Sequence, residues 1–117
     1  MTNRPDPLVY LEDILQSLRM IRSYIATSSE KAFLDDPQLQ DAVIRRLLVI
    51  GEASARMPEA YKLAHPDIPW HKMSGMRNRL VHGYAEVDMS LVWDTVQNDL
   101  PPLETSLGGL LGGTDVT

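Results

Sequence analysis

The stretch LVYLEDILQSLRMIRSYI, residues 8–25, decides the fold class of this protein. Its large aliphatic side chains recur about every three or four positions, which is the period of one face of an amphipathic helix. Two further stretches, residues 39–50 and 91–103, carry apolar stripes of the same kind. No run of strand length alternates between apolar and polar residues. The sequence therefore predicts an all-α protein.

Capping residues, prolines and a glycine divide the predicted helices. Asp36 followed by Pro37 is typical of a helix start, because the carboxylate can accept hydrogen bonds from free backbone N–H groups. We expect that helix to reach Met57, a short helix at residues 59–63, and a third main helix over residues 69–83. Each boundary is a local signal, so the helix order follows without knowledge of tertiary contacts.

The last part of the chain is predicted to hold one kinked helix and a flexible end. We expect Asp88 to cap this helix and Pro101 and Pro102 to kink it, because proline lacks a backbone donor and restricts the residue before it. The glycine-rich residues 108–117 are expected to be flexible. The whole pattern predicts one domain at residues 1–107, an antiparallel bundle of four main helices plus a short helix.

Composition excludes several classes of chemistry. The 117 residues include no cysteine, so the protein has no disulfide, no thiolate nucleophile and no thiolate metal ligand. The formal net charge of −5 argues against a protein that coats nucleic acid through bulk electrostatics. The charge is uneven, however, since residues 45–79 hold seven basic residues and three acidic ones. A local basic patch of this kind can bind a phosphate.

We expect no metal, cofactor or membrane contact. His65 and His71 lie six positions apart and do not form a helical ligand pair. The apolar runs are far shorter than the ~20 residues of a membrane-spanning helix. Residues 1–15 lack the charged, apolar and small-residue order of a secretion signal. The sequence therefore predicts a soluble cytoplasmic protein.

Residues 77–84, RNRLVHGY, place several reactive side chains close together. A histidine can take or give a proton near neutral pH, and an arginine can bind a phosphate through two parallel hydrogen bonds. Together they meet the needs of RNA cleavage: a base for the ribose 2′-hydroxyl and a fixed cation for the charge that develops on phosphorus. The alternative is a hydrogen-bonded histidine at a helix end and a tyrosine packed on a neighbouring helix.

The angular positions of Arg77 and His82 pose a geometric problem. Each helical residue advances by about 100°, so these side chains lie about 140° apart on a regular helix. Arg79 and His82, three positions apart, are instead neighbours on one face. A site that contains both Arg77 and His82 therefore needs the helix to end or bend near Gly83, or needs a second copy of the chain.

The segment MRNRLVHGYAEVD, residues 76–88, closely resembles the signature of the HepT-like toxins, a branch of the HEPN (higher eukaryotes and prokaryotes nucleotide-binding) superfamily. The shared pattern is an arginine, any four residues, a histidine, any one residue and a tyrosine. In this chain these are Arg77, His82 and Tyr84. The resemblance extends to LEDIL at 11–15, IGEA at 50–53, IPWHKMSGMRN at 68–78 and VWDTVQNDLPPL at 92–103.

The resemblance implies a fold, an activity and a set of site residues. The family has an HEPN-like all-α fold and forms homodimers in which two copies of the motif face one cleft. Its members are metal-independent endoribonucleases, so Arg77 and His82 would be the catalytic pair. Asn78 and Arg79 would position the substrate phosphate, and Glu52 would orient Arg77.

The resemblance also implies a regulatory partner. In a type VII toxin–antitoxin system, a cognate minimal nucleotidyltransferase would silence the toxin by adding AMP to Tyr84, because the modification puts anionic bulk into a phosphate-binding cleft. Many relatives carry an aromatic residue after the tyrosine, where this chain has Ala85 and then Glu86. The implied partners are RNA, the nucleotidyltransferase and a second copy of the chain, with a larger assembly left open.

Several alternatives remain open at this stage. The chain can instead be a non-catalytic helical dimer that binds a nucleotidyltransferase or a nucleotide. Glu52 can be an ordinary solvated glutamate. Gly51 is expected to permit close helix packing, and Trp70 and Trp93 are expected in the core or at a dimer interface.

Overall fold

The computed structural model describes residues 6–83 and 87–114, and this part of the chain is all helical apart from its connections. The predicted all-α class is confirmed, with no strand among the described residues. Within them, no helix combines the length and the apolar character needed to cross a lipid bilayer. The helices are α1 (Pro7–Ile25), α2 (Glu30–Leu34), α3 (Pro37–Arg56), α4 (Glu59–Ala64), α5 (Trp70–Gly83), α6 (Met89–Asn98) and α7 (Leu100–Thr114).

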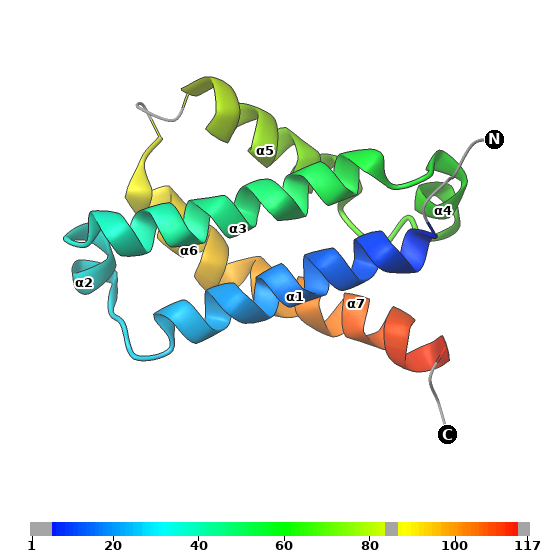
Figure 1. Cartoon of the computed structure of the whole chain (residues 1–117), viewed down its shortest axis with the longest axis horizontal. Helices are drawn as coiled ribbons and strands as arrows, with labels where there is room; N and C mark the ends of the chain where they lie inside the picture. The colour runs from blue at the N-terminus through cyan, green and yellow to red at the C-terminus, as the bar shows by residue number, and fades with distance from the viewer. Residues whose placement is uncertain (1–5, 84–86, 115–117) are drawn as a thin grey trace.

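The long helices form an antiparallel bundle with α3 in a central position (Figure 1). Helix α3 packs against α1 on one side and α5 on the other, and α7 packs against α1. Successive long helices run in opposite directions, as Figure 1 shows for α1, α3 and α5. Helix α3 therefore fixes the position of α5, which carries the described motif residues.

Carboxylate caps define the starts of three helices. The Oδ1 atom of Asp36 accepts a hydrogen bond from the Leu39 backbone at 3.1 Å, and Pro37 occupies the first turn of α3. The Oδ1 atom of Asp88 accepts one from the Ser90 backbone at 2.9 Å at the start of α6. Both predicted caps are confirmed. Asp6, which was not predicted to cap a helix, does the same for α1.

The predicted stripe of α1 forms the centre of the hydrophobic core. Leu11 and Ile14 are fully buried, and the same face of α1 continues through Leu18 and Ile21. The tryptophans lie where they were expected to: Trp70 is buried, and the half-buried ring of Trp93 lies 5.5 Å from the ring of Phe33. This core holds α1, α3 and α6 together through contacts far apart in the sequence.

The last part of the chain differs from its prediction in two ways. The expected kinked helix is two helices, α6 and α7, which meet at Asp99. Pro101 and Pro102 lie in the first turn of α7, where a missing backbone donor costs little. Residues 108–114, which belong to the segment expected to be flexible, are helical. Their glycines disfavour a helix, but Leu110 packs against the core and offsets part of that cost.

Two short helices complete the fold. The predicted short helix is α4, which begins after Pro58 and ends at Ala64. Helix α2 was not predicted from the sequence. It is held by the Ser29 side chain, which accepts a hydrogen bond from the Ala32 backbone at 3.1 Å, and by the fully buried ring of Phe33. The amide of Gln40 also donates to the Phe33 carbonyl at 3.0 Å.

Candidate active site

Helix α5 carries the described part of the Arg-x4-His-x-Tyr motif. It begins at Trp70, whose indole nitrogen donates a hydrogen bond to the His65 carbonyl at 3.0 Å, and it ends at Gly83 as predicted. The predicted modification site, Tyr84, lies outside the described residues together with Ala85 and Glu86. The structure therefore describes the arginine and the histidine of the motif.

The close approach of α3 and α5 depends on Gly51. A Cβ atom at this position would lie 2.1 Å from the Arg77 Cβ and 2.9 Å from the Met73 carbonyl oxygen. These separations are much shorter than the ~3.5–4.0 Å of ordinary carbon contacts, so only glycine fits without movement of α5. The predicted packing role of Gly51 is confirmed. Glycine at this point brings the first part of the Arg77 side chain directly onto α3.

The Arg77 side chain is anchored by Glu52, the residue after Gly51. The Nε and Nη2 atoms of Arg77 both donate to Oε1 of Glu52, at 3.1 and 2.7 Å. The two side chains are 29% and 40% exposed, so the pair is only partly open to water. The predicted contact of Glu52 with Arg77 is present. Arg56, one turn further along α3, donates to the other Glu52 oxygen at 2.7 Å.

The two arginines change the acidity of the carboxyl group between them. Hydrogen bonds from Arg77 and then from Arg56 lower the pKa of Glu52 below its ordinary value of 4.5, and desolvation opposes this shift. Hydrogen bonds to the ionised form are the main cause, because they stabilise the carboxylate and not the neutral acid. Glu52 is therefore a fixed negative charge at neutral pH.

The remaining donors of Arg77 point to what it can bind. Its Nη1 atom donates to Oδ1 of Asn78 at 2.7 Å, so the hydrogen bonds to Glu52 and Asn78 engage all three guanidinium nitrogens. A guanidinium has five N–H donors, which leaves one on each terminal nitrogen. A guanidinium with two such N–H groups can donate to phosphate oxygens. Glu52 and Asn78 thus hold Arg77 in place, while one N–H group on each terminal nitrogen remains available to a phosphate.

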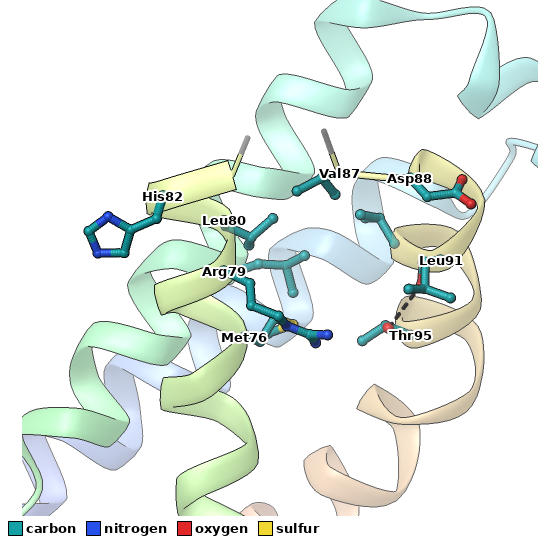
Figure 2. A pocket seen from close by; sticks show the side chains of 10 residues that line it. Met76, Arg79, Leu80, His82, Val87, Asp88, Leu91 and Thr95 are labelled. Atoms are coloured by element: carbon teal, nitrogen blue, oxygen red, sulfur yellow. Dashed lines mark hydrogen bonds between the residues drawn. The ribbon is translucent and has the colours of Figure 1, made fainter. Parts of the chain in front are cut away.

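His82 and Arg79 lie on another side of α5, beside a cavity of about 480 Å³ between α5 and α6. They are neighbours along this cavity, as their spacing predicted. Figure 2 shows the Arg79 side chain directed from α5 toward α6, whereas the imidazole of His82 points away from α6. Both side chains are exposed. The lining residues are Leu47, Met76, Arg79, Leu80, His82, Val87, Asp88, Leu91, Val92 and Thr95.

Arg77 lines a different hollow, of about 560 Å³, on the face formed by α1, α3 and α5. This hollow also contains Tyr10, Asp13 and Arg45. One copy of the chain therefore brings Glu52 and Asn78 to Arg77 and places Arg79 and His82 beside one cavity, but it does not place Arg77 and His82 in the same cavity. The separation agrees with the angle of about 140° expected for a regular helix.

Sequence reasoning missed some residues of the site. Arg56 shares the Glu52 carboxylate, and the four-residue spacing of the pair on a predicted helix was a usable signal. The wall that α6 gives to the cavity, including Leu91 and Thr95, had no local signal. Among the described residues, no three histidine, aspartate or glutamate side chains come together in a group able to hold a metal ion.

The fold and the side chains together define a class: an all-α protein whose α5 presents a carboxylate-anchored arginine and an exposed histidine. A model of one family, described as ribonuclease HepT-like, matches residues 14–108. The chain therefore belongs to the HepT-like ribonuclease family. This finding confirms the resemblance recognised in the sequence, and with it the enzyme class of ribonuclease.

Individual relatives cover most of the chain. It is 43% identical to the protein named "Probable ribonuclease HepT" of Thermococcus cleftensis over 95 residues. The matched region covers 81% of this chain and 86% of the relative. It is 34% identical to "Putative RNase TTE0752" of Caldanaerobacter subterraneus over 105 residues. That matched region covers 90% of this chain and 94% of the relative. No solved structure matches the chain significantly.

Proposed function

We propose that this protein is the toxin of a type VII toxin–antitoxin system and a metal-independent endoribonuclease that uses Arg77 and His82. One observation carries the proposal: Glu52 and Asn78 hold the guanidinium of Arg77 with one donor left on each terminal nitrogen, five residues before an exposed histidine. Membership of a ribonuclease family supports the same reading. The names of the two relatives, which describe ribonucleases, agree with it.

The proposed reaction is an internal transesterification of RNA. His82 removes the proton of a ribose 2′-hydroxyl, and the resulting oxygen attacks the adjacent phosphorus. The bond from phosphorus to the 5′-oxygen of the next nucleotide breaks, and that oxygen takes a proton from solvent. The products are a 2′,3′-cyclic phosphate and a 5′-hydroxyl. Arg77 and Asn78 hold the phosphate, and Arg77 stabilises the charge that develops on it.

A homodimer is part of this proposal, with a larger assembly left open. Within one copy, Arg77 and His82 line different hollows. A second copy that packs against the motif face can supply the missing partner, so that a site contains Arg77 from one copy and His82 from the other. Val81, between the two residues on α5, is 53% exposed and offers apolar surface for such an interface.

The proposal includes a partner that switches the toxin off. By resemblance to its family, a minimal nucleotidyltransferase adds AMP to Tyr84, two residues after His82. The added phosphate is anionic and competes with the RNA phosphate for the same cations. In this proposal the protein acts in the cytoplasm, on cellular RNA.

The test is RNA cleavage by purified protein in excess EDTA. We expect the wild-type protein to cut RNA and leave 2′,3′-cyclic phosphate and 5′-hydroxyl ends, and we expect His82→Ala and Arg77→Ala to lose this activity while remaining folded. His71→Ala, an exposed histidine on the first turn of α5, is the matched control and should cut normally.

Three outcomes count against the proposal. Loss of wild-type cleavage in EDTA contradicts the metal-independent mechanism. Equal cleavage by His82→Ala and the wild type contradicts the assigned base. A folded protein that never cuts RNA but binds the nucleotidyltransferase or a nucleotide favours the non-catalytic binding module.

The intact mass of the protein after co-expression with the nucleotidyltransferase tests the switch. Each AMP added to Tyr84 raises the mass of the wild-type protein, and the Tyr84→Phe protein should not gain this mass.

A further inference from the structure

The cavity between α5 and α6 has apolar walls and an arginine directed into it. Helix α5 packs along α3, and α6 lies across the cavity from α5 (Figure 2). The walls consist of aliphatic and methionine side chains from α3, α5 and α6 and the segment before α6, namely Leu47, Met76, Leu80, Val87, Leu91 and Val92. With a volume of about 480 Å³, the cavity falls within the range of ~300–1,000 Å³ typical of small-ligand sites.

Part of the apolar wall is in contact with water, whereas Leu47, Leu80 and Val92 are buried. Leu91 is 57% exposed, and Met76 is only partly buried. Apolar surface in a concave site gains free energy when another apolar face covers it. A flat ring with two apolar faces and polar edges fits such a site, because its faces can contact the walls while its edges meet the polar residues at the rim.

The polar groups at the rim include both hydrogen-bond donors and acceptors. Arg79 has no hydrogen-bond or ion-pair partner among the described residues, and Figure 2 shows its side chain extending toward Thr95. The Thr95 hydroxyl donates to the Leu91 carbonyl at 2.9 Å, which leaves its oxygen as an acceptor. Asp88 uses Oδ1 to cap α6 and retains Oδ2 as a second acceptor.

We propose that this cavity binds the guanine base of the RNA nucleotide beside the scissile phosphate, with Arg79 as the residue that determines specificity. This inference rests on the proposed ribonuclease function. His82 lies at the rim of the same cavity, with its ring directed outward. An RNA backbone that passes His82 therefore has a neighbouring base within reach of the cavity.

Guanine matches the donors and acceptors of the rim better than the other bases. Its O6 and N7 atoms are adjacent acceptors, which an arginine binds through two parallel hydrogen bonds. Adenine places an N6 donor where guanine has O6, and pyrimidines lack N7 altogether. The N1 and N2 donors of guanine lie on the adjacent Watson–Crick edge and suit acceptors such as Asp88 and Thr95. Arg79 thus selects a base instead of binding only a phosphate.

The first test is the sequence preference of cleavage. A pool of RNA with randomised positions is cut by the wild-type protein in EDTA, and the new ends are sequenced. We expect guanine to be enriched at one fixed position next to the cut, and Arg79→Ala and Arg79→Lys to lower that enrichment by about 5- to 150-fold, because lysine cannot make two parallel hydrogen bonds. Arg19→Ala, an exposed arginine of α1 outside this cavity, should keep the wild-type preference.

The second test measures binding without cleavage. Methyl signals of Met76 and Leu91 are followed by NMR while GMP, AMP, CMP, UMP or inorganic phosphate is added to the wild-type protein. We expect these methyl signals to shift most with GMP and the Arg79→Lys protein to lose the difference between the four nucleotides. GMP is not a cleavable RNA, so this result does not depend on catalysis.

The outcomes separate this inference from the proposed function. Cleavage without base preference, with equal methyl shifts for all four nucleotides, overturns the guanine site and leaves the ribonuclease intact. Selective shifts with GMP in a protein that never cuts RNA support the guanine site and contradict the ribonuclease. Shifts caused equally by inorganic phosphate, or by raising the protein concentration without nucleotide, also overturn the inference, because phosphate or a second copy of the chain then occupies the cavity.

Discussion

Replacement of Gly51 by alanine tests whether the contact between α3 and α5 sets the position of Arg77. The new Cβ atom would lie 2.1 Å from the Arg77 Cβ. An ordinary contact of ~3.5–4.0 Å would require α5 to move away by about 1.5–2 Å. The nearest groups are a Cβ atom and a backbone carbonyl, neither of which can rotate away, so the helix itself must shift.

The magnitude follows from two opposing effects. Overpacking at a tight contact costs about 1–3 kcal/mol, and the rigid neighbours at Gly51 favour the upper end of that range. Replacement of glycine by alanine within a helix stabilises that helix by about 1 kcal/mol, which offsets part of the cost. We therefore expect Gly51→Ala to lower the free energy of unfolding by about 2 kcal/mol. In a domain of this size that corresponds to a fall in Tm of roughly 8 °C.

Gly75 of α5 provides a matched control away from this crowded contact. It lies in α5, and a Cβ atom added there would meet nothing within 4 Å. Gly75→Ala should therefore raise the free energy of unfolding by up to about 1 kcal/mol, because only helix propensity changes. Thermal melts of both variants, followed by circular dichroism, compare the same chemical change in a crowded and an open place.

Cleavage rates add a second measurement for the same pair. A misplacement of about 1 Å in a catalytic group can reduce a rate by about 100-fold. At a temperature where both variants are folded, we expect Gly51→Ala to lose RNA cleavage to about this extent and Gly75→Ala to keep it. If Gly51→Ala melts and cuts RNA as Gly75→Ala does, the reasoning about the α3–α5 contact is refuted.

Three further predictions concern stability. Glu52→Gln should lower stability at pH 7 and have a smaller effect in acid. The lowered pKa of Glu52 stabilises the folded state above about 4.5, and this contribution is lost as the pH falls through the lowered pKa of the folded protein. Urea melts of both proteins at a series of falling pH values should therefore show a shrinking difference. Asp36→Ala removes the cap of α3 and should cost about 1 kcal/mol in the same assay, whereas Asp36→Asn should cost much less. Leu107→Ala should cost about 2–5 kcal/mol, since this side chain is fully buried; a cost below 0.5 kcal/mol would mean that α7 does not pack as described.

The parts of the fold that were predictable are those with local signals. Periodic apolar residues, Asp36 and Asp88 caps and the prolines mark helix positions without reference to the rest of the chain. Helix α2 was not predicted, because it is stabilised by the burial of Phe33 beneath α6, a contact distant in sequence. The helix over residues 108–114 was not predicted for a similar reason. Its glycines disfavour a helix, and only the packing of its leucines against the core favours one.

The site divides in the same way. The motif spacing was enough to predict that Arg77 and His82 lie on different sides of one helix, because the helical period fixes that angle. The contact between Glu52 and Arg77 was one of two alternatives left open by the sequence, the other being a solvated glutamate. The cavity beside Arg79 was not, because it depends on how far α5 lies from α6, and the sequence of neither helix records that distance.

Stability and chemistry meet at adjacent positions of α3. Gly51 draws α5 close, and Glu52 then reaches the guanidinium that the close approach has brought within hydrogen-bond distance. A side chain that moved α5 outward would therefore weaken the packing and release Arg77 together. His82 has no equivalent anchor on α3, since it projects from another side of α5. In the proposed dimer, each copy would thus contribute a rigid cation to one site and an exposed base to the other, so formation of the interface and assembly of the site would be one event.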